Sequence, residues 1–455
     1  MSAENQEQIF QCRNFIIPFF YSLLLFCLTF NSLTSAQEKL SQSEKQIIID
    51  TLCSMLEKLY PIPGTGQKTS AAIHKKYEEG KYSEYKIISE FVQQLNDDLE
   101  SISKDGHLGI IYDPVMVSAL KGEEETGEKG DSYEKITAES ERWNNYGFKE
   151  LKILEGNIGY LDLRTFFSLK YAGQTAAAAM NFFSDCNALI IDLRRNGGGW
   201  DDMVTFLASY FINDNDDIIF SITSSTLDSS YFASKPYVYL PGKKLTDIPL
   251  VILTSNSTAS AAEAFTNIMK HFSKHASVIG ETTAGAENPV DDVILFGDYI
   301  LRIPTWKKIY SYDKSGWEGK GIKPDIEIES EKALNYSHKF LLHKLLDATD
   351  EETIKVKYQW YIDGVNAFNN PVRVSENVLQ SYGGKYGNRI ITYENGSLFY
   401  QYKGRTRRKM SAISNKYFII EGYDFFRVKF VIDDNGVTGL NEIYDDGNVT
   451  RLIKE

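Results

Sequence analysis

Ser260 lies where an apolar, strand-like run meets a helix-like run, and a serine in such a place can act as a nucleophile. The run PLVILT ends at residue 254, and a helical pattern starts at Ser260. Free N–H groups and the dipole at a helix N-terminus stabilise negative charge beside the hydroxyl. The small neighbours Ala259, Ala261 and Ala262 leave room for a substrate. An ordinary Ser/Thr helix cap explains the same segment, so this pattern needs support from elsewhere in the chain.

A glycine-rich turn after a second buried strand could supply N–H groups for an oxyanion. It occupies residues 192–199, DLRRNGGG, at the end of the apolar run ALIIDL. Consecutive glycines let the backbone turn tightly, and their N–H groups can point at a developing negative charge. The spacing lacks the lysine of a phosphate-binding loop. We expect Ala261 and Gly198 to form the oxyanion hole, and Gly197 and Gly199 to contact the substrate.

One histidine and one glutamate could complete the chemistry. His107 stands in KDGHL, at the seam between helical and mixed segments. Histidine is the usual base for a serine because its pKa lies near neutrality, although a lone histidine beside glycine is more often an ordinary loop residue. Glu318 lies between Trp317 and Gly319, where it could orient a base or be a solvated loop acid.

In order and approximate spacing, these segments resemble the core signatures of the tail-specific (C-terminal-processing) protease family, peptidase family S41. The resembling stretches are DLRRNGGG, TASAAE, GETTAG and GKGIKPDIEI, and the resemblance covers roughly residues 45–330. It implies a serine-type peptidase that forms an acyl-enzyme on Ser260 and requires no metal or other cofactor. It also implies an α/β fold with a ClpP/crotonase-like layered core.

The sequence favours one of the two catalytic arrangements of that family. The serine–lysine branch places its lysine in GxxTFGKG, but the matching stretch here is GETTAGAE, with Ala286 at the lysine position. The chain is similar instead to the branch of the tricorn core protease and interphotoreceptor retinoid-binding protein. That similarity implies His107 as general base and Glu318 as the supporting glutamate. Tricorn-type proteins carry a serine before the histidine, where this chain has Gly106.

Two other functions fit the same resemblance. One is a non-catalytic protein that binds a hydrophobic ligand or a peptide on this scaffold, and the other is hydrolysis of a non-peptide ester, because a fold alone does not fix the substrate. The stretch between His107 and Gly159 is too short for the PDZ domain that many family members insert. We therefore expect no PDZ domain and no strict selection of C-terminal tails.

Changes of pattern along the chain predict five segments. They are a signal peptide (1–36), a helical cap (37–107), a catalytic α/β core (108–335), a helical connector (336–372) and a C-terminal antiparallel β domain (373–455) that resembles lipocalin-like modules. Within the core we expect a largely parallel sheet, because apolar strands alternate with helices. We also expect a strand over 109–117, a charged loop over 121–133, a helix over 335–349 and a connector over 350–372.

The first residues indicate export. Arg13 precedes the 16-residue apolar run from Phe15 to Phe30, and small polar residues follow it up to Ala36. Such a run is shorter than the roughly 20 residues of a membrane span and is typical of a signal peptide. We expect cleavage after Ala36, a periplasmic or extracellular location and no stable membrane span afterwards; an uncleaved anchor is the alternative.

Composition limits the partners. The 455-residue chain carries a net charge of −13, which repels nucleic-acid backbones, so we expect no nucleic-acid partner. The basic stretch 403–409 is then a solvated hairpin or a contact patch. The expected partner is a peptide or protein substrate, and a homo-oligomer stays open. Cys53 and Cys186 lie in no metal-binding pattern, and sequence alone does not say whether they pair.

Overall fold

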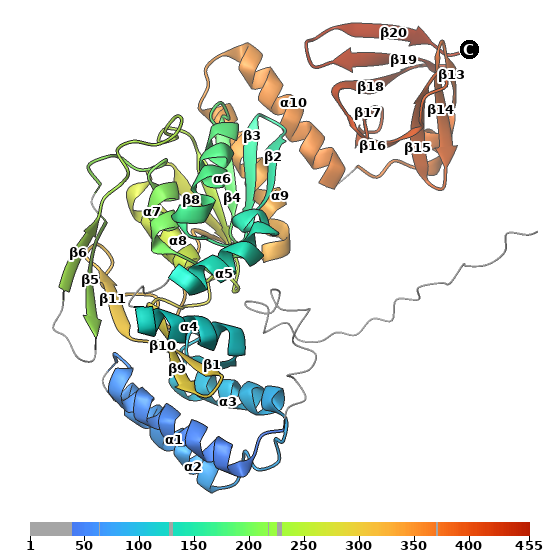
Figure 1. Ribbon diagram of the computed structural model, residues 1–455. Helices are drawn as coiled ribbons and strands as arrows, with labels where there is room; N and C mark the ends of the chain where they lie inside the picture. Colours follow the sequence, from blue (N-terminus) through green and yellow to red (C-terminus); the bar gives the residue numbers. More distant parts are fainter. Residues whose placement is uncertain (1–38, 63, 127–130, 217, 225–229, 370–371) are drawn as a thin grey trace, which may run out of the picture. The chain divides into compact units, whose positions relative to one another are not determined.

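The computed structural model describes residues 39–62, 64–126, 131–216, 218–224, 230–369 and 372–455 (Figure 1). The predicted signal peptide lies outside these residues. Contacts divide the chain into two units: a first unit of residues 1–140, 223–229 and 288–308, and a second unit of residues 141–222, 230–287 and 309–455. Among the described helices, none is both long and apolar enough to cross a membrane.

The first unit combines helices with a three-stranded antiparallel sheet of order β1-β10-β9. Its elements are α1 (Gln42–Leu59), α2 (Thr65–Glu78), α3 (Ile88–Ser103), β1 (Gly109–Tyr112), α4 (Pro114–Thr126), α5 (Asp131–Arg142), β9 (Val290–Phe296) and β10 (Tyr299–Pro304). Apolar side chains of α1, α2 and α3 bury one core together with Leu295, Leu301 and Ile303 of the sheet. The predicted helical cap is therefore confirmed, and it is completed by strands from far along the chain.

Helix α4 corrects two expectations. Residues 114–117 were expected to continue a strand, and residues 121–133 to form a loop, but α4 runs from Pro114 to Thr126 and α5 begins at Asp131. Asp113 accepts a hydrogen bond from the N–H of Met116 (2.9 Å) and so caps the helix. Proline at the first helical position has a φ that suits a helix. The Asp-Pro pair thus ends the strand and starts the helix.

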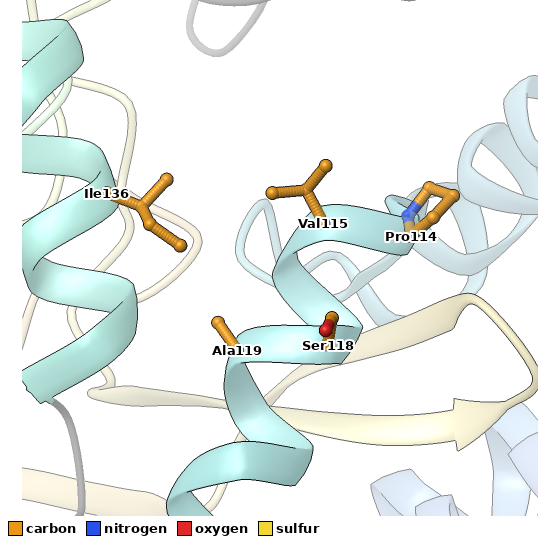
Figure 2. Close-up of a pocket in the computed structure, with 5 residues that line it drawn as sticks. All are labelled: Pro114, Val115, Ser118, Ala119 and Ile136. Atoms are coloured by element: carbon orange, nitrogen blue, oxygen red, sulfur yellow. The ribbon is translucent and has the colours of Figure 1, made fainter.

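Helices α4 and α5 border a shallow apolar groove of about 410 Å³, and Figure 2 shows Val115 and Ile136 facing each other across it. Pro114, Ser118 and Ala119 complete its lining. None of the residues predicted for catalysis lines this groove.

The second unit is built on a six-stranded sheet of order β12-β8-β7-β4-β3-β2. The strands are β2 (Phe148–Leu154), β3 (Ile158–Leu163), β4 (Ala188–Asp192), β7 (Leu250–Thr254), β8 (Ala276–Gly280) and β12 (Ile326–Glu327). Strands β3, β4, β7, β8 and β12 pair in parallel, and β2 adds to β3 antiparallel. The largely parallel core sheet is confirmed, and the carboxyl ends of its parallel strands share one edge, where ligands bind in open α/β sheets.

Helices pack against this sheet. They are α6 (Leu169–Phe182), α7 (Asp201–Ala208), α8 (Ala261–Phe272), α9 (Ser330–Asp347) and α10 (Glu352–Asn369), and the 3₁₀ turn η2 (Asn145–Gly147) precedes β2. Leu341 and Leu342 of α9 bury against alternate side chains of the strands, such as Ile190 and Val251. Strands β5 (Ile218–Ser224) and β6 (Ser230–Ser234) pair antiparallel, and β11 (Trp306–Tyr310) follows β10 in the chain.

Helix α10 occupies most of the connector expected over residues 350–372. Tyr358, Ile362 and Val365 recur at helical spacing and bury in the same core as α9. Gly364 lies inside this stripe, and its low helix propensity hides the pattern in the sequence. Burial against α9 and the sheet outweighs that cost.

The C-terminal part of the second unit is an eight-stranded antiparallel sheet in which each strand pairs with the next. Helix α11 (Glu376–Ser381) precedes β13 (Gly384–Tyr386), β14 (Arg389–Glu394), β15 (Ser397–Tyr402), β16 (Arg408–Ser414), β17 (Tyr417–Ile420), β18 (Tyr423–Asp433), β19 (Gly436–Tyr444) and β20 (Val449–Ile453). The N–H of Glu455 donates to the carbonyl of Lys385 (2.9 Å), so the chain end after β20 reaches β13 and nearly closes a barrel. The predicted antiparallel β domain is confirmed.

The packing of α10 predicts a large difference between two substitutions on this helix. Ile362→Ala, at a side chain with 2% exposure, should lower the free energy of unfolding by about 2–5 kcal/mol because it leaves a cavity against α9. Val356→Ala, on the same helix with 66% exposure, should change it by no more than about 0.5 kcal/mol. Urea unfolding of both variants checks this, and equal losses would contradict the packing described.

Candidate active site

Ser260 occupies a sharp turn between β7 and α8. Two hydroxyls tie this turn to the end of β4: Ser255 Oγ donates to the carbonyl of Arg194 (2.6 Å) and Thr258 Oγ1 to that of Leu193 (2.8 Å). Ser260 has φ 55° and ψ −123°. A plain N-cap residue is normally extended, and a side chain at positive φ costs about 1–3 kcal/mol. This conformation is typical of the strained strand-to-helix turn that presents a nucleophilic serine.

The glycine turn packs directly on Ser260. Gly198 has φ 113°, and a Cβ at that residue would lie 2.6 Å from Ser260 Cβ and 3.0 Å from the nitrogen of Ala261. The N–H of Ala259 donates to the carbonyl of Asn196 (3.1 Å). Only glycine tolerates both the positive φ and this close approach, so the sequence of the turn follows from the contact with Ser260.

The N–H groups beside Ser260 differ in whether a hydrogen-bond acceptor already binds them. No described residue accepts a hydrogen bond from the N–H of Ala261, at the first position of α8. The N–H of Gly198, in contrast, donates to Asn196 Oδ1 (2.9 Å). Asn196 is fully buried, and its Nδ2 donates to the carbonyl of Leu163 (3.0 Å). Asn196 thus fixes the glycine turn, a role that the DLRRNGGG pattern alone did not reveal.

A buried carboxylate holds the Ser260 turn. Glu263, fully buried on α8, accepts hydrogen bonds from the N–H of Ser260 (2.9 Å) and Ala286 (2.8 Å) at Oε2. Its Oε1 accepts from Thr283 Oγ1 (2.5 Å) and the N–H of Gly285 (2.7 Å). Burial raises the pKa of Glu263, and these hydrogen bonds oppose that rise. The Ser-x-x-Glu spacing of a capping box was the available sequence signal for the bond to Ser260.

Glu318 lies in a loop bound to the same region. Its Oε2 accepts from the N–H of Glu287 (2.7 Å), while Glu287 Oε2 accepts from the N–H groups of Trp317 (3.1 Å) and Glu318 (3.3 Å). The N–H of Gly319 donates to the carbonyl of Gly285 (2.8 Å). Burial raises the pKa of Glu287. The turn of Ser260, the first turn of α8 with Glu263, and the loop of Glu318 therefore form one hydrogen-bonded network within the second unit.

His107 belongs to the first unit, between α3 and β1. Its N–H donates to Asp105 Oδ1 (2.9 Å), and the other carboxylate oxygen of Asp105 accepts from the hydroxyl of Tyr60. Burial lowers the pKa of His107; the charge of Asp105 raises it and that of Arg302 lowers it further. Nδ1 of the ring is buried without a hydrogen-bond partner among the described residues. The lowered pKa favours the neutral imidazole, which is the form that a base requires.

Other polar candidates have structural surroundings. His338 Nε2 lies 2.8 Å from the carbonyl of Glu155, and the ring of His271 stacks on Tyr312 at 4.2 Å. Cys53 and Cys186 are buried free thiols, so they do not pair. Within the described ranges, no cluster of His, Cys, Asp or Glu side chains is arranged to hold a metal ion.

Two family models match the chain. Residues 157–328 match the model described as peptidase family S41, and residues 32–143 match the N-terminal domain of peptidase S41 in eukaryotic IRBP. The second match covers the segment that carries His107.

Individual relatives are more distant. A "probable CtpA-like serine protease" of Staphylococcus epidermidis is 29% identical over 178 residues, which cover 39% of this chain and 35% of that protein. A protein of the same description from Staphylococcus aureus strain COL is 27% identical over 39% of this chain and 34% of its own. The chain thus spans about a third of the length of these relatives. The structure of a lipoprotein from Streptococcus agalactiae aligns with 65% of this chain and 96% of its own, at 17% identity and a TM-score of 0.43.

The network around Glu263 predicts a costly isosteric change. Glu263→Gln replaces one acceptor oxygen by an N–H₂ group that faces backbone donors, so the free energy of unfolding should fall by about 1–3 kcal/mol. Hydrogen exchange at the amides of Gly285 and Ala286 should accelerate. Glu329→Gln, at a side chain with 70% exposure, is the matched control and should leave both measurements unchanged. Unaltered exchange in Glu263→Gln would contradict the network.

Proposed function

We propose that this chain, which belongs to peptidase family S41, is an exported serine-type peptidase that cleaves peptide bonds through an acyl-enzyme on Ser260. The observation that carries the proposal is the strained turn of Ser260 at the N-terminus of α8, with the backbone of Gly198 packed against it. A serine that only capped the helix would need neither the positive φ nor a glycine at its side. The expected substrate is a peptide or protein chain.

The oxyanion hole follows from the N–H groups beside Ser260. When Ser260 Oγ attacks the scissile carbonyl, the carbonyl oxygen becomes negative and needs donors already in place. The N–H of Ala261 has no competing acceptor among the described residues, so we assign it as the first donor. The second donor comes from the stretch Gly197–Gly199. If it is Gly198, as the sequence favours, its N–H must release Asn196 Oδ1 to bind the oxyanion.

His107 supplies the base in this proposal. A neutral imidazole takes the proton of Ser260 as Oγ attacks, and the imidazolium then gives that proton to the leaving amine. Water completes the cycle by attacking the acyl-enzyme, with the same imidazole as base. The match of residues 32–143 to the IRBP-type N-terminal domain and the lowered pKa of His107 support this role. Glu318 would act as the supporting glutamate from the loop that contacts Glu287.

Ala286 supports the choice of histidine over lysine. The serine–lysine arrangement requires a lysine side chain at this place in the GETTAGAE stretch. Here the residue has only a methyl group, and its N–H donates to Glu263. This residue holds the Ser260 turn through its backbone, and we therefore assign the base to another segment.

An active-site probe tests the nucleophile. A fluorophosphonate should label the wild-type protein at Ser260 and leave Ser260→Ala unlabelled, because the probe reacts with an activated hydroxyl. His107→Ala should slow labelling and peptide turnover by about 100- to 10,000-fold, the usual contribution of a general base. Labelling of wild type and Ser260→Ala at equal rates would show that the nucleophile is assigned wrongly.

The surroundings of His107 predict the pH dependence of activity. Because the pKa of His107 is lowered, the neutral base persists to lower pH, and the acid limb of kcat/KM should lie below the ordinary histidine value of about 6.5. Arg302→Gln removes a neighbouring cation and leaves Asp292 without its ion-pair partner, so it should move this limb to higher pH. Arg407→Gln in the C-terminal domain makes the same change of net charge and should not move it. A limb that stays in place in Arg302→Gln would count against His107 as the titrating base.

A further inference from the structure

Three arginines gather at the carboxyl ends of β3 and β4. Asp162 and Asp192 lie opposite each other in this parallel pair. Arg194 binds Asp192 through Nε (2.8 Å) and Nη2 (2.6 Å). Asp162 accepts two hydrogen bonds from Arg164 (2.6 and 2.8 Å) and a third from Nη2 of Arg195 (3.0 Å).

This cluster carries an excess positive charge. Three guanidinium groups face two carboxylates, and the next acid in register, Glu150 on β2, is paired with Lys152 (2.7 Å). Arg164 already contacts both oxygens of Asp162, so Arg195 is not needed to neutralise that buried carboxylate. A surplus cation at this edge stands out in a chain with a net charge of −13.

Arg195 is also the most accessible member of the cluster. Its side chain is 54% exposed, compared with 34% for Arg164 and 15% for Arg194. A guanidinium has several N–H donors in a planar fork that matches a carboxylate, and only one of them, Nη2, binds Asp162. The remaining donors can bind a second carboxylate.

Both accessible arginines flank the glycine turn. Arg195 immediately precedes Asn196, whose carbonyl accepts from the N–H of Ala259, next to the nucleophile. Arg164 immediately precedes Thr165, whose hydroxyl donates to the carbonyl of Gly198 (3.1 Å). Both arginines are therefore next in the chain to residues that bind the glycine turn or the Ser260 turn, which a substrate peptide has to pass to reach Ser260.

We propose that Arg195, together with Arg164, binds a carboxylate of the substrate peptide close to the scissile bond and so determines specificity. This inference rests on the proposed peptidase function and names the chemistry that the site prefers. An Asp or Glu side chain and a free C-terminal carboxylate share this chemistry. Charge-assisted, bidentate hydrogen bonds give both energy and orientation at such a contact.

Binding to the Ser260→Ala protein tests the proposal without requiring turnover. Short alanine-rich peptides with a neutral fluorophore carry an internal Glu with an amidated end, an internal Gln with an amidated end, or an internal Gln with a free carboxylate. We expect one or both carboxylate peptides to bind more tightly than the neutral one, which identifies the source of the carboxylate. Adding Arg195→Gln should reduce this preference roughly 10-fold or more.

Matched variants separate recognition from structural effects. Arg195→Lys keeps the charge and should retain part of the preference, whereas Arg407→Gln should retain all of it. A purely structural role of Arg195 predicts equal weakening for charged and neutral peptides, and that result would overturn the proposal. So would a parent protein that binds no peptide or shows no preference. If the preference is present but the Ser260-intact protein never cleaves, the peptidase function fails and the carboxylate site stands.

Discussion

The geometry around Ser260 depends on one buried carboxylate. A carboxylate away from water is stable only when protein donors replace its hydration, and Glu263 receives four: the N–H groups of Ser260, Gly285 and Ala286 and the hydroxyl of Thr283. The two carboxylate oxygens of Glu263 thus join the strained turn of Ser260 to the loop that follows β8. Neither segment can relax without leaving a buried charge short of donors, and this constraint maintains the positive φ of Ser260.

The same constraint extends to Glu318. Thr283 accepts a hydrogen bond from the N–H of Ile322 at its hydroxyl (2.6 Å), and Gly285 accepts from Gly319. The loop of Glu318 is therefore held by the residues that Glu263 holds. Glu287 adds a reciprocal pair of backbone contacts with Glu318. The supporting glutamate is therefore placed through backbone partners that its loop shares with Glu263.

Local sequence patterns could predict the strands, the glycine turn and the place of Ser260, because periodicity and turn residues are local properties. They could not predict the other three donors of Glu263 beyond Ser260, since Thr283, Gly285 and Ala286 come from a second segment that only tertiary packing brings close. They also could not pair β1 with β10, whose residues Gly109 and Arg302 meet across a long sequence separation. Helix α4 could not be predicted for a different reason. The apolar run GIIYDPVMV has the composition of a strand, and this signal is stronger than that of the Asp-Pro helix start inside it.

The packed interior of the C-terminal domain argues against the alternative function, in which the protein carries a hydrophobic ligand there. A lipocalin-like resemblance suggests a hollow barrel, but Tyr382 stacks on Phe430 at 3.9 Å, and Phe418 packs edge-on against both rings. Arg389 and the hydroxyl of Tyr400 also bind Glu442 in this domain, and a hydrophobic ligand could not replace these polar contacts. A ligand would have to displace this packed core. Within the second unit, the open carboxyl edge of the parallel sheet, with Ser260 and the glycine turn, is therefore a better place for a ligand than the interior of the C-terminal domain.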